Sequence, residues 1–128
     1  MTLSLPITVT NTIEDALVFN APDPDNLVGA RIDAITRAIL IRQWEEFVYQ
    51  YTVIKFDPDK HCIVDDVDDT LSRLAYDWVM SRTGQGDIFE DNWGKRWGKK
   101  LAHIAKYQGT LHMEYDYDQK LVTLGLVR

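Results

Sequence analysis

The apolar residues between positions 28 and 51 recur at intervals of three and four. This is the period of an α-helix with one buried side, so the pattern predicts a long first helix of about six turns. Its apolar stripe consists of Val28, Ile32, Ile35, Ile39, Leu40, Trp44, Phe47, Val48 and Tyr51. The preceding segment, residues 20–26, contains two prolines and several short polar residues, and it predicts a loop.

The second half of the chain predicts two further helices. The second helix begins near Asp68 or Asp69, ends at Thr83-Gly84 and has one apolar side. That side consists of Leu71, Leu74, Ala75, Trp78 and Val79. The third helix covers residues 87–107, where Asp87 and Glu90 have the spacing of a capping box and Gly109 ends the helix.

An alternation of apolar and polar residues predicts a strand at the N-terminus. The apolar positions of this strand are Leu3, Leu5, Ile7 and Val9. Pro6 cannot donate a backbone hydrogen bond, so we expect the strand at a sheet edge. Residues 13–19, which follow, fit either a short helix or a second strand.

Two hairpins are also predicted. Asp57-Pro-Asp-Lys60 has proline at the second position of a turn and lies between apolar runs, which favours a hairpin joining residues 52–56 to residues 61–64. The alternative is a first helix that continues to Phe56. Residues 111–115 and 122–126 alternate on both sides of a polar turn and predict a C-terminal hairpin.

Together these elements predict an α+β fold for a single globular domain of residues 1–128. Three main helices are expected to pack on a small, mostly antiparallel sheet made of the N-terminal strand and the two hairpins. A hydrophobic content of 45% is enough to form a buried core.

The formal net charge of −6 argues against a protein whose whole surface binds nucleic acid or an anionic membrane. The chain contains no run of 18 apolar residues and no apolar leader, so we expect a cytoplasmic protein without a membrane partner. Its one cysteine, Cys62, excludes an internal disulfide and fits a reducing compartment.

The charge is distributed unevenly, because residues 93–106, WGKRWGKKLAHIAK, contain five cations and no acid. The remaining residues therefore carry a net charge of −11. On a helix, a bulky ridge of Trp and Leu would lie beside a bare ridge of Gly and Ala, with a cationic third side. We interpret this stretch as a candidate interaction surface, whose residues are Trp93, Gly94, Lys95, Arg96, Trp97, Gly98, Lys99, Lys100 and Lys106.

The same helix has a second interpretation, in which its large apolar residues are core. The buried stripe would then be Phe89, Trp93, Trp97, Leu101 and Ile104. Each glycine inside a helix costs about 1 kcal/mol relative to alanine. Close packing of Gly94, Gly98 and Ala102 against the first helix or a second copy of the chain would offset this cost.

An acidic segment, residues 57–69, is the expected counterpart of the cationic helix, within one molecule or across a dimer. Its candidate acidic surface consists of Asp57, Asp59, Asp65, Asp66, Asp68 and Asp69. Exposed ion pairs contribute only about 0–1 kcal/mol each, so this pairing would set orientation more than stability.

One short string within the acidic segment has a chemical precedent. Asp66-Val-Asp-Asp-Thr-Leu71 resembles the first motif of the haloacid dehalogenase phosphatases, and the resemblance implies a nucleophilic Asp66, a general acid at Asp68 and bound Mg²⁺. The match covers six residues, and the chain after it predicts two helices and a hairpin rather than alternating strands and helices. We therefore do not assign the chain to that family.

Other catalytic and metal-binding motifs are lacking. His61 and Cys62 lie among acids, but their spacing fits neither a zinc site nor a calcium loop. The sequence contains no glycine-rich phosphate loop and no nucleophile elbow. We predict no metal, no cofactor and no catalytic residue.

The sequence therefore favours a non-enzymatic protein-binding module, either a homodimer or a small acidic regulator or inhibitor. Its partner would be another protein or a second copy of itself. The alternative is single-strand nucleic-acid binding through the basic helix, with phosphates on the cations and a base stacked on a Trp or on Tyr107. A weaker alternative is an enzyme with an unrecognised site, for which Asp66, Asp68 and His61 are the first candidates.

Overall fold

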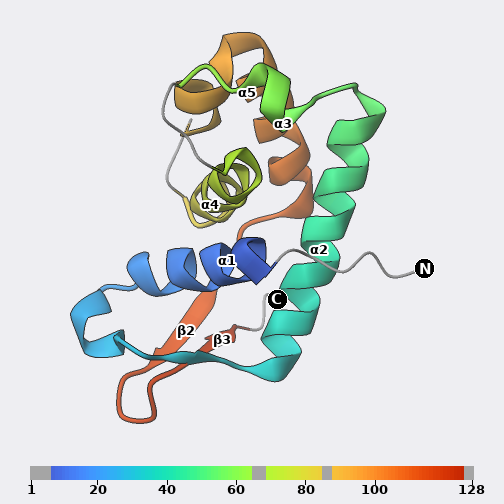
Figure 1. Ribbon diagram of the computed structural model, residues 1–128. Helices are drawn as coiled ribbons and strands as arrows, with labels where there is room; N and C mark the ends of the chain where they lie inside the picture. Colours follow the sequence, from blue (N-terminus) through green and yellow to red (C-terminus); the bar gives the residue numbers. More distant parts are fainter. Residues whose placement is uncertain (1–6, 65–68, 85–87, 126–128) are drawn as a thin grey trace.

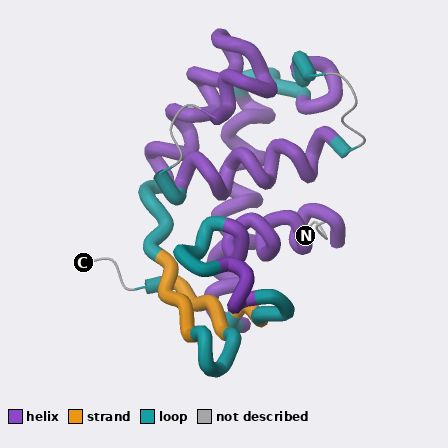
Figure 2. The backbone as a smooth tube through the Cα atoms, turned by 90° about the vertical axis from the view of Figure 1, so that its left-hand side faces the viewer, coloured by secondary structure: helices purple, strands orange, loops and turns teal. Residues whose placement is uncertain are grey.

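The computed structural model describes residues 7–64, 69–84 and 88–125, and it confirms the predicted α+β fold (Figure 1). The helices are α1 (Ile7–Phe19), α2 (Ala34–Val53), α3 (Pro58–His61), α4 (Thr70–Arg82) and α5 (Ile88–Gln108), with a 3₁₀ helix, η1, at Pro24–Leu27. The strands are β1 (Arg31–Ile32), β2 (Met113–Asp116) and β3 (Leu121–Leu124). Figure 2 shows the strands together at one end of the molecule, with most of the helical part at the other end.

The small sheet has β3 in the centre, with the order β1-β3-β2. The predicted C-terminal hairpin is confirmed, because β2 and β3 pair antiparallel with Tyr115 opposite Val122. β1 adds a short parallel pairing to β3, which makes the sheet mixed. The buried Thr36 hydroxyl of α2 accepts a hydrogen bond from the Leu124 amide at 2.9 Å, so the sheet is tied to the first turn of α2.

The core between α2, α4 and α5 is aromatic. Trp44, Phe47, Trp78 and Phe89 are fully buried. The Trp44 and Trp78 rings meet edge to face with centroids 5.4 Å apart, and Phe47 stacks on Phe89 at 6.0 Å. These geometries are the ones that aromatic pairs prefer, so the three helices are held in one mutual arrangement.

Arg82, at the end of α4, fastens the C-terminal end of α5 to α2. The buried guanidinium donates hydrogen bonds to the backbone oxygens of Gln108 and Gly109 and to the side-chain oxygen of Gln43. Burial lowers the pKa of Arg82 to about 10, which still leaves it charged at neutral pH. Removing it would leave several partly buried acceptors without this donor.

The predicted second helix is confirmed as α4, and the predicted first helix is α2 with a later start. Asp69 caps α4 by accepting a hydrogen bond from the Ser72 amide at 3.1 Å, and Asp33 caps α2 in the same way from Thr36. Two members of the predicted apolar stripe, Val28 and Ile35, are 69% and 72% exposed. Val28 precedes β1 and therefore lies outside the helix, whereas Ile35 lies within α2, where Thr36 and Leu40 face the core instead.

The predicted N-terminal strand is wrong over its described residues, since the chain is helical from residue 7. Val9, Ile13, Ala16 and Leu17 are buried, and α1 packs against α4. These positions are spaced as on one side of a helix, and their burial against α4 favours a helix over the strand that the shorter alternation suggests. Residues 1–6 lie outside the described residues.

The predicted hairpin at residues 52–64 is also wrong. α2 continues to Val53, close to the alternative boundary at Phe56, and Lys55 then turns the chain with a φ of 68°. Asp57 caps the short helix α3 by accepting from the Asp59 amide, and Pro58 occupies the first helical position, which suits proline. The same Asp-Pro pair that suggests a turn therefore starts a helix.

The third predicted helix exists as α5, but it is broken at Gly94, whose φ of 81° and ψ of 166° are not helical. The break folds the first turn of α5 back onto the rest. As a result, a Cβ atom placed on Gly98 would lie 2.7 Å from the Cα atom of Glu90. The sequence predicts that Gly98 packs against the first helix or a second copy of the chain. Its close neighbour is instead Glu90, which belongs to α5 itself.

Replacing Gly98 with alanine should destabilise the fold by about 1–3 kcal/mol, because the added methyl group overlaps the backbone of Glu90. Urea denaturation of the variant and the wild type measures the difference. Lys99→Ala, at the exposed next position, is the control and should have little effect. An alanine variant at position 98 as stable as the wild type would contradict the close contact.

Candidate interaction surface on helix α5

A buried carboxylate fixes the start of the cationic stretch. Asp77 of α4 is fully buried, and its Oδ2 accepts hydrogen bonds from the Asn92 side chain at 2.8 Å and from the Trp93 indole nitrogen at 2.9 Å. Its Oδ1 lies 3.8 Å from the Nε of Arg73. Burial raises the pKa of Asp77, and the bonds from Asn92 and Trp93 partly offset that rise.

Beyond the break at Gly94, α5 exposes a continuous cationic face, which we define by Lys95, Arg96, Lys99, Lys100 and Lys106. His103 and Tyr107 are exposed beside these residues. With about 100° per residue, the exposed side chains span an arc of about 140° and a length of about 17 Å. No acid occurs between residues 95 and 108.

The cations of this face have no carboxylate within salt-bridge distance among residues 7–64, 69–84 and 88–125. The salt bridges there join Arg37 to Glu14 and Arg73 to Asp77. Lys95 and Lys99, and likewise Arg96 and Lys100, are like charges four residues apart, which slightly oppose helix formation. Among the described residues, the cations of this face therefore repel one another without a salt bridge to offset the repulsion.

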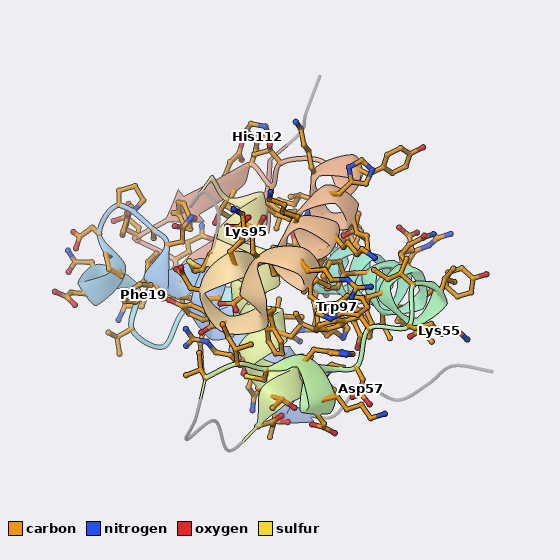
Figure 3. All side chains as sticks on the ribbon, turned by 90° about the horizontal axis from the view of Figure 1, so that it is seen from above. Phe19, Lys55, Asp57, Lys95, Trp97 and His112 are labelled. Atoms are coloured by element: carbon orange, nitrogen blue, oxygen red, sulfur yellow. The ribbon has the colours of Figure 1, made fainter. Side chains whose placement is uncertain are left out.

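Trp97 borders the cationic face and is covered by its neighbours. Its ring lies 4.5 Å from that of His61 and 5.5 Å from that of Phe56, measured between centroids. The Arg96 guanidinium carbon lies 5.4 Å, and the Lys100 ammonium nitrogen 5.0 Å, from the Trp97 ring centroid. Figure 3 shows Trp97 on the side of α5 nearer Lys55 and Asp57, with Lys95 on a different side of the helix.

His61 is itself held in place. Its Nδ1 accepts a hydrogen bond from the Asp57 amide at 2.9 Å, which closes the single turn of α3, and its ring stacks on Phe56. Burial, together with the nearby charges of Asp57 and Asp59, raises the pKa of Tyr51 to about 12. The structure thus brings part of the acidic segment to the border of the cationic face without forming ion pairs between the described residues of the two.

The predicted interaction residues separate into two groups. Trp93 and Gly98 are buried, Gly94 forms the break and Trp97 is half-buried, whereas the five cations are exposed. The predicted buried stripe, Phe89, Trp93, Trp97, Leu101 and Ile104, matches the core-facing side, although Trp97 and Ile104 are only partly covered. The surface of this helix is therefore cationic rather than a ridge of tryptophan and glycine.

The predicted acidic surface is only partly described. Asp57 and Asp69 are helix caps, Asp59 is exposed and contacts the Thr70 hydroxyl, and Asp65, Asp66 and Asp68 lie outside the described residues. The phosphatase-like string therefore enters the described chain only at its end, as the cap and first turn of α4. The described residues after it form two helices and a hairpin, which is not the alternating architecture of that family.

Sequence reasoning missed Asp77, and it missed Phe56 and His61 as partners of Trp97. One local signal for Asp77 was available, because it lies outside the predicted apolar side but has apolar residues three positions away on either side, Leu74 and Met80. A charged residue at such a position is rarely buried without hydrogen-bond partners. The contacts of Trp97 have no comparable signal, since they depend on the turn after α2.

The described ranges contain no group of three or more His, Cys, Asp or Glu residues that could hold a metal. Within the same ranges, no helix is long and apolar enough to cross a membrane.

No protein-family model, curated protein or solved structure matches this chain.

The raised pKa of Asp77 predicts a pH-dependent stability. The folded chain holds the Asp77 proton more tightly than the unfolded chain, so this contribution is fully present below the ordinary aspartate pKa of about 3.9 and is lost as the pH rises through the folded-state pKa. Asp77→Asn should remove that loss. Urea denaturation between about pH 4 and 7 should show the variant gaining stability relative to the wild type as the pH rises.

The same substitution at the exposed Asp118 is the matched control for the loss of one carboxyl group. A pH-independent difference for Asp77→Asn would show that burial does not govern the protonation of this carboxyl.

Proposed function

We propose that this protein is a non-enzymatic protein-binding module that binds an acidic surface of its partner through the cationic face of α5. The observation that carries the proposal is the exposure of Lys95, Arg96, Lys99, Lys100 and Lys106 with no carboxylate within 4.0 Å in the described chain. The partner is another protein or a second copy of the chain. In the second case, the acidic surface would come from the residues outside 93–106, which carry a net charge of −11.

Charge distribution favours a protein partner over a long polyanion. Residues outside 93–106 carry a net charge of −11, so they repel a nucleic acid that extends beyond the helix. A protein with a local acidic patch can cover a face about 17 Å long without approaching the rest of the surface. Complementary charges of this kind mainly raise the association rate and fix the orientation of a complex.

Neutralising the face should weaken binding to an acidic chain. The probe is poly-L-glutamate of about five residues, which is short enough to lie on the face without extending beyond it. The variant is Lys95→Gln combined with Arg96→Gln, Lys99→Gln and Lys100→Gln. Because each exposed pair contributes about 0–1 kcal/mol, we expect roughly tenfold to thousandfold weaker binding by calorimetry at low salt.

The control removes four cations elsewhere, by Arg31→Gln, Arg42→Gln, Lys55→Gln and Lys120→Gln, and keeps the same net charge as the first variant. Its affinity should remain much closer to that of the wild type. Equal losses in the two variants, or no binding by the wild type, would refute the proposed face.

A single-stranded nucleic acid is the second candidate, and Tyr107 is the observation that favours it. This side chain is 91% exposed and follows Lys106, so it is available to stack on a base. The two tryptophans of the cationic stretch are less suited to that role. Trp93 is buried, and Trp97 already contacts His61, Arg96 and Lys100.

An oligo-dT strand distinguishes the two candidates. For a protein-binding face, we expect oligo-dT to bind more weakly than poly-L-glutamate of equal charge, and Tyr107→Ala to change neither affinity. Fluorescence anisotropy at matched ionic strength measures both. Tighter binding of oligo-dT that is lost in the Tyr107 variant would support the nucleic-acid candidate instead.

A further inference from the structure

We propose that Trp97 is the positioning residue of the cationic face, and that Arg96 and Lys100, held over its ring, anchor a partner segment carrying neighbouring carboxylates. This inference rests on the proposed function and specifies which part of the face binds the acidic partner most strongly.

The position of Trp97 is fixed from outside α5. Phe56 is buried just after α2, and His61 is held by the Asp57 amide within α3. Both rings contact Trp97, so the indole rests against two elements that precede α5 in the sequence. A ring confined in this way gives nearby side chains a fixed surface to pack on.

Arg96 and Lys100 use that surface. Their charged groups lie 5.4 and 5.0 Å from the Trp97 ring centroid, within the range of cation–π attraction. An exposed arginine or lysine otherwise loses side-chain conformational entropy when a partner immobilises it. For these two residues, part of that ordering is present before binding.

The remaining cations provide an internal comparison. Lys95 and Lys99 lie about 160° around the helix from Trp97, too far to pack over its ring. Each pair has the same spacing of four residues and the same charge. The two pairs therefore differ in two respects. Only Arg96 and Lys100 contact the indole, and only that pair contains an arginine.

The chemistry of the anchored pair indicates its ligand. The planar guanidinium of Arg96 matches the two oxygens of a carboxylate, and the Lys100 ammonium accommodates a second carboxylate nearby. An acidic protein segment offers such neighbouring carboxylates. A nucleic-acid base would have to displace these cations, or His61, to stack on the indole.

The first experiment removes each pair in the otherwise native chain. Poly-L-glutamate is the probe, and calorimetry at low salt compares Arg96→Gln/Lys100→Gln with Lys95→Gln/Lys99→Gln. We expect the Arg96 and Lys100 pair to weaken binding about five- to thirtyfold more than the other pair. Arg96→Lys, included as a further variant, separates the effect of the guanidinium from that of its position. Equal losses for the two pairs would overturn the inference.

The second experiment tests whether Trp97 acts through these cations. In a Trp97→Leu background, the effect of Arg96→Gln should shrink, whereas the effect of Lys106→Gln should stay unchanged, because coupled residues give non-additive changes and separate ones do not. Trp97→Phe should retain most of the affinity by keeping an aromatic face. Full additivity for Arg96 would overturn the positioning role.

The outcomes separate this inference from the proposed function. If the wild type does not bind poly-L-glutamate, the proposed function fails. If it binds and loses affinity equally from both pairs, the cationic face stands and only the role of Trp97 fails.

Discussion

The direction of the cationic face depends on the hydrogen bonds of one buried carboxylate. Asp77 draws Asn92 and Trp93 inward, and Gly94 then adopts a positive φ that few other residues tolerate. The helix that follows starts from this fixed point, with Gly98 packed against Glu90. Because Trp93 and Gly98 are both buried, the charged side chains of residues 95–106 face solvent.

The duplicated tetrapeptides, Trp-Gly-Lys-Arg and Trp-Gly-Lys-Lys, have different structures in the same helix. In the first, the tryptophan is core and the glycine breaks the helix; in the second, the tryptophan is half-buried and the glycine allows close packing. Local sequence is therefore insufficient to assign their roles. The contacts made by Asp77 on one side, and by Phe56 and His61 on the other, decide them.

Prediction succeeded where periodicity was long and local. α4 and the C-terminal hairpin follow directly from their apolar patterns, and the exposure of the five cations follows from the helical period. It failed where a short pattern had two solutions. The alternation before Val9 and the turn signal at Asp57-Pro58 suit strands locally, but burial against α4 and helix capping at α3 favour helices. The break at Gly94 depends on a carboxylate 17 residues earlier, which no local pattern records.

The sequence of α5 conflicts with the local rules of helix stability, since it contains like charges four residues apart and a glycine in the helix interior. The fold tolerates this because the opposite side of α5 is anchored by buried aromatic residues and by the Arg82 contacts at its C-terminal end. Such conflicts are expected where a surface serves binding rather than stability. An acidic partner would relieve the repulsion between the cations, so the same charges that slightly destabilise the free helix would stabilise the complex.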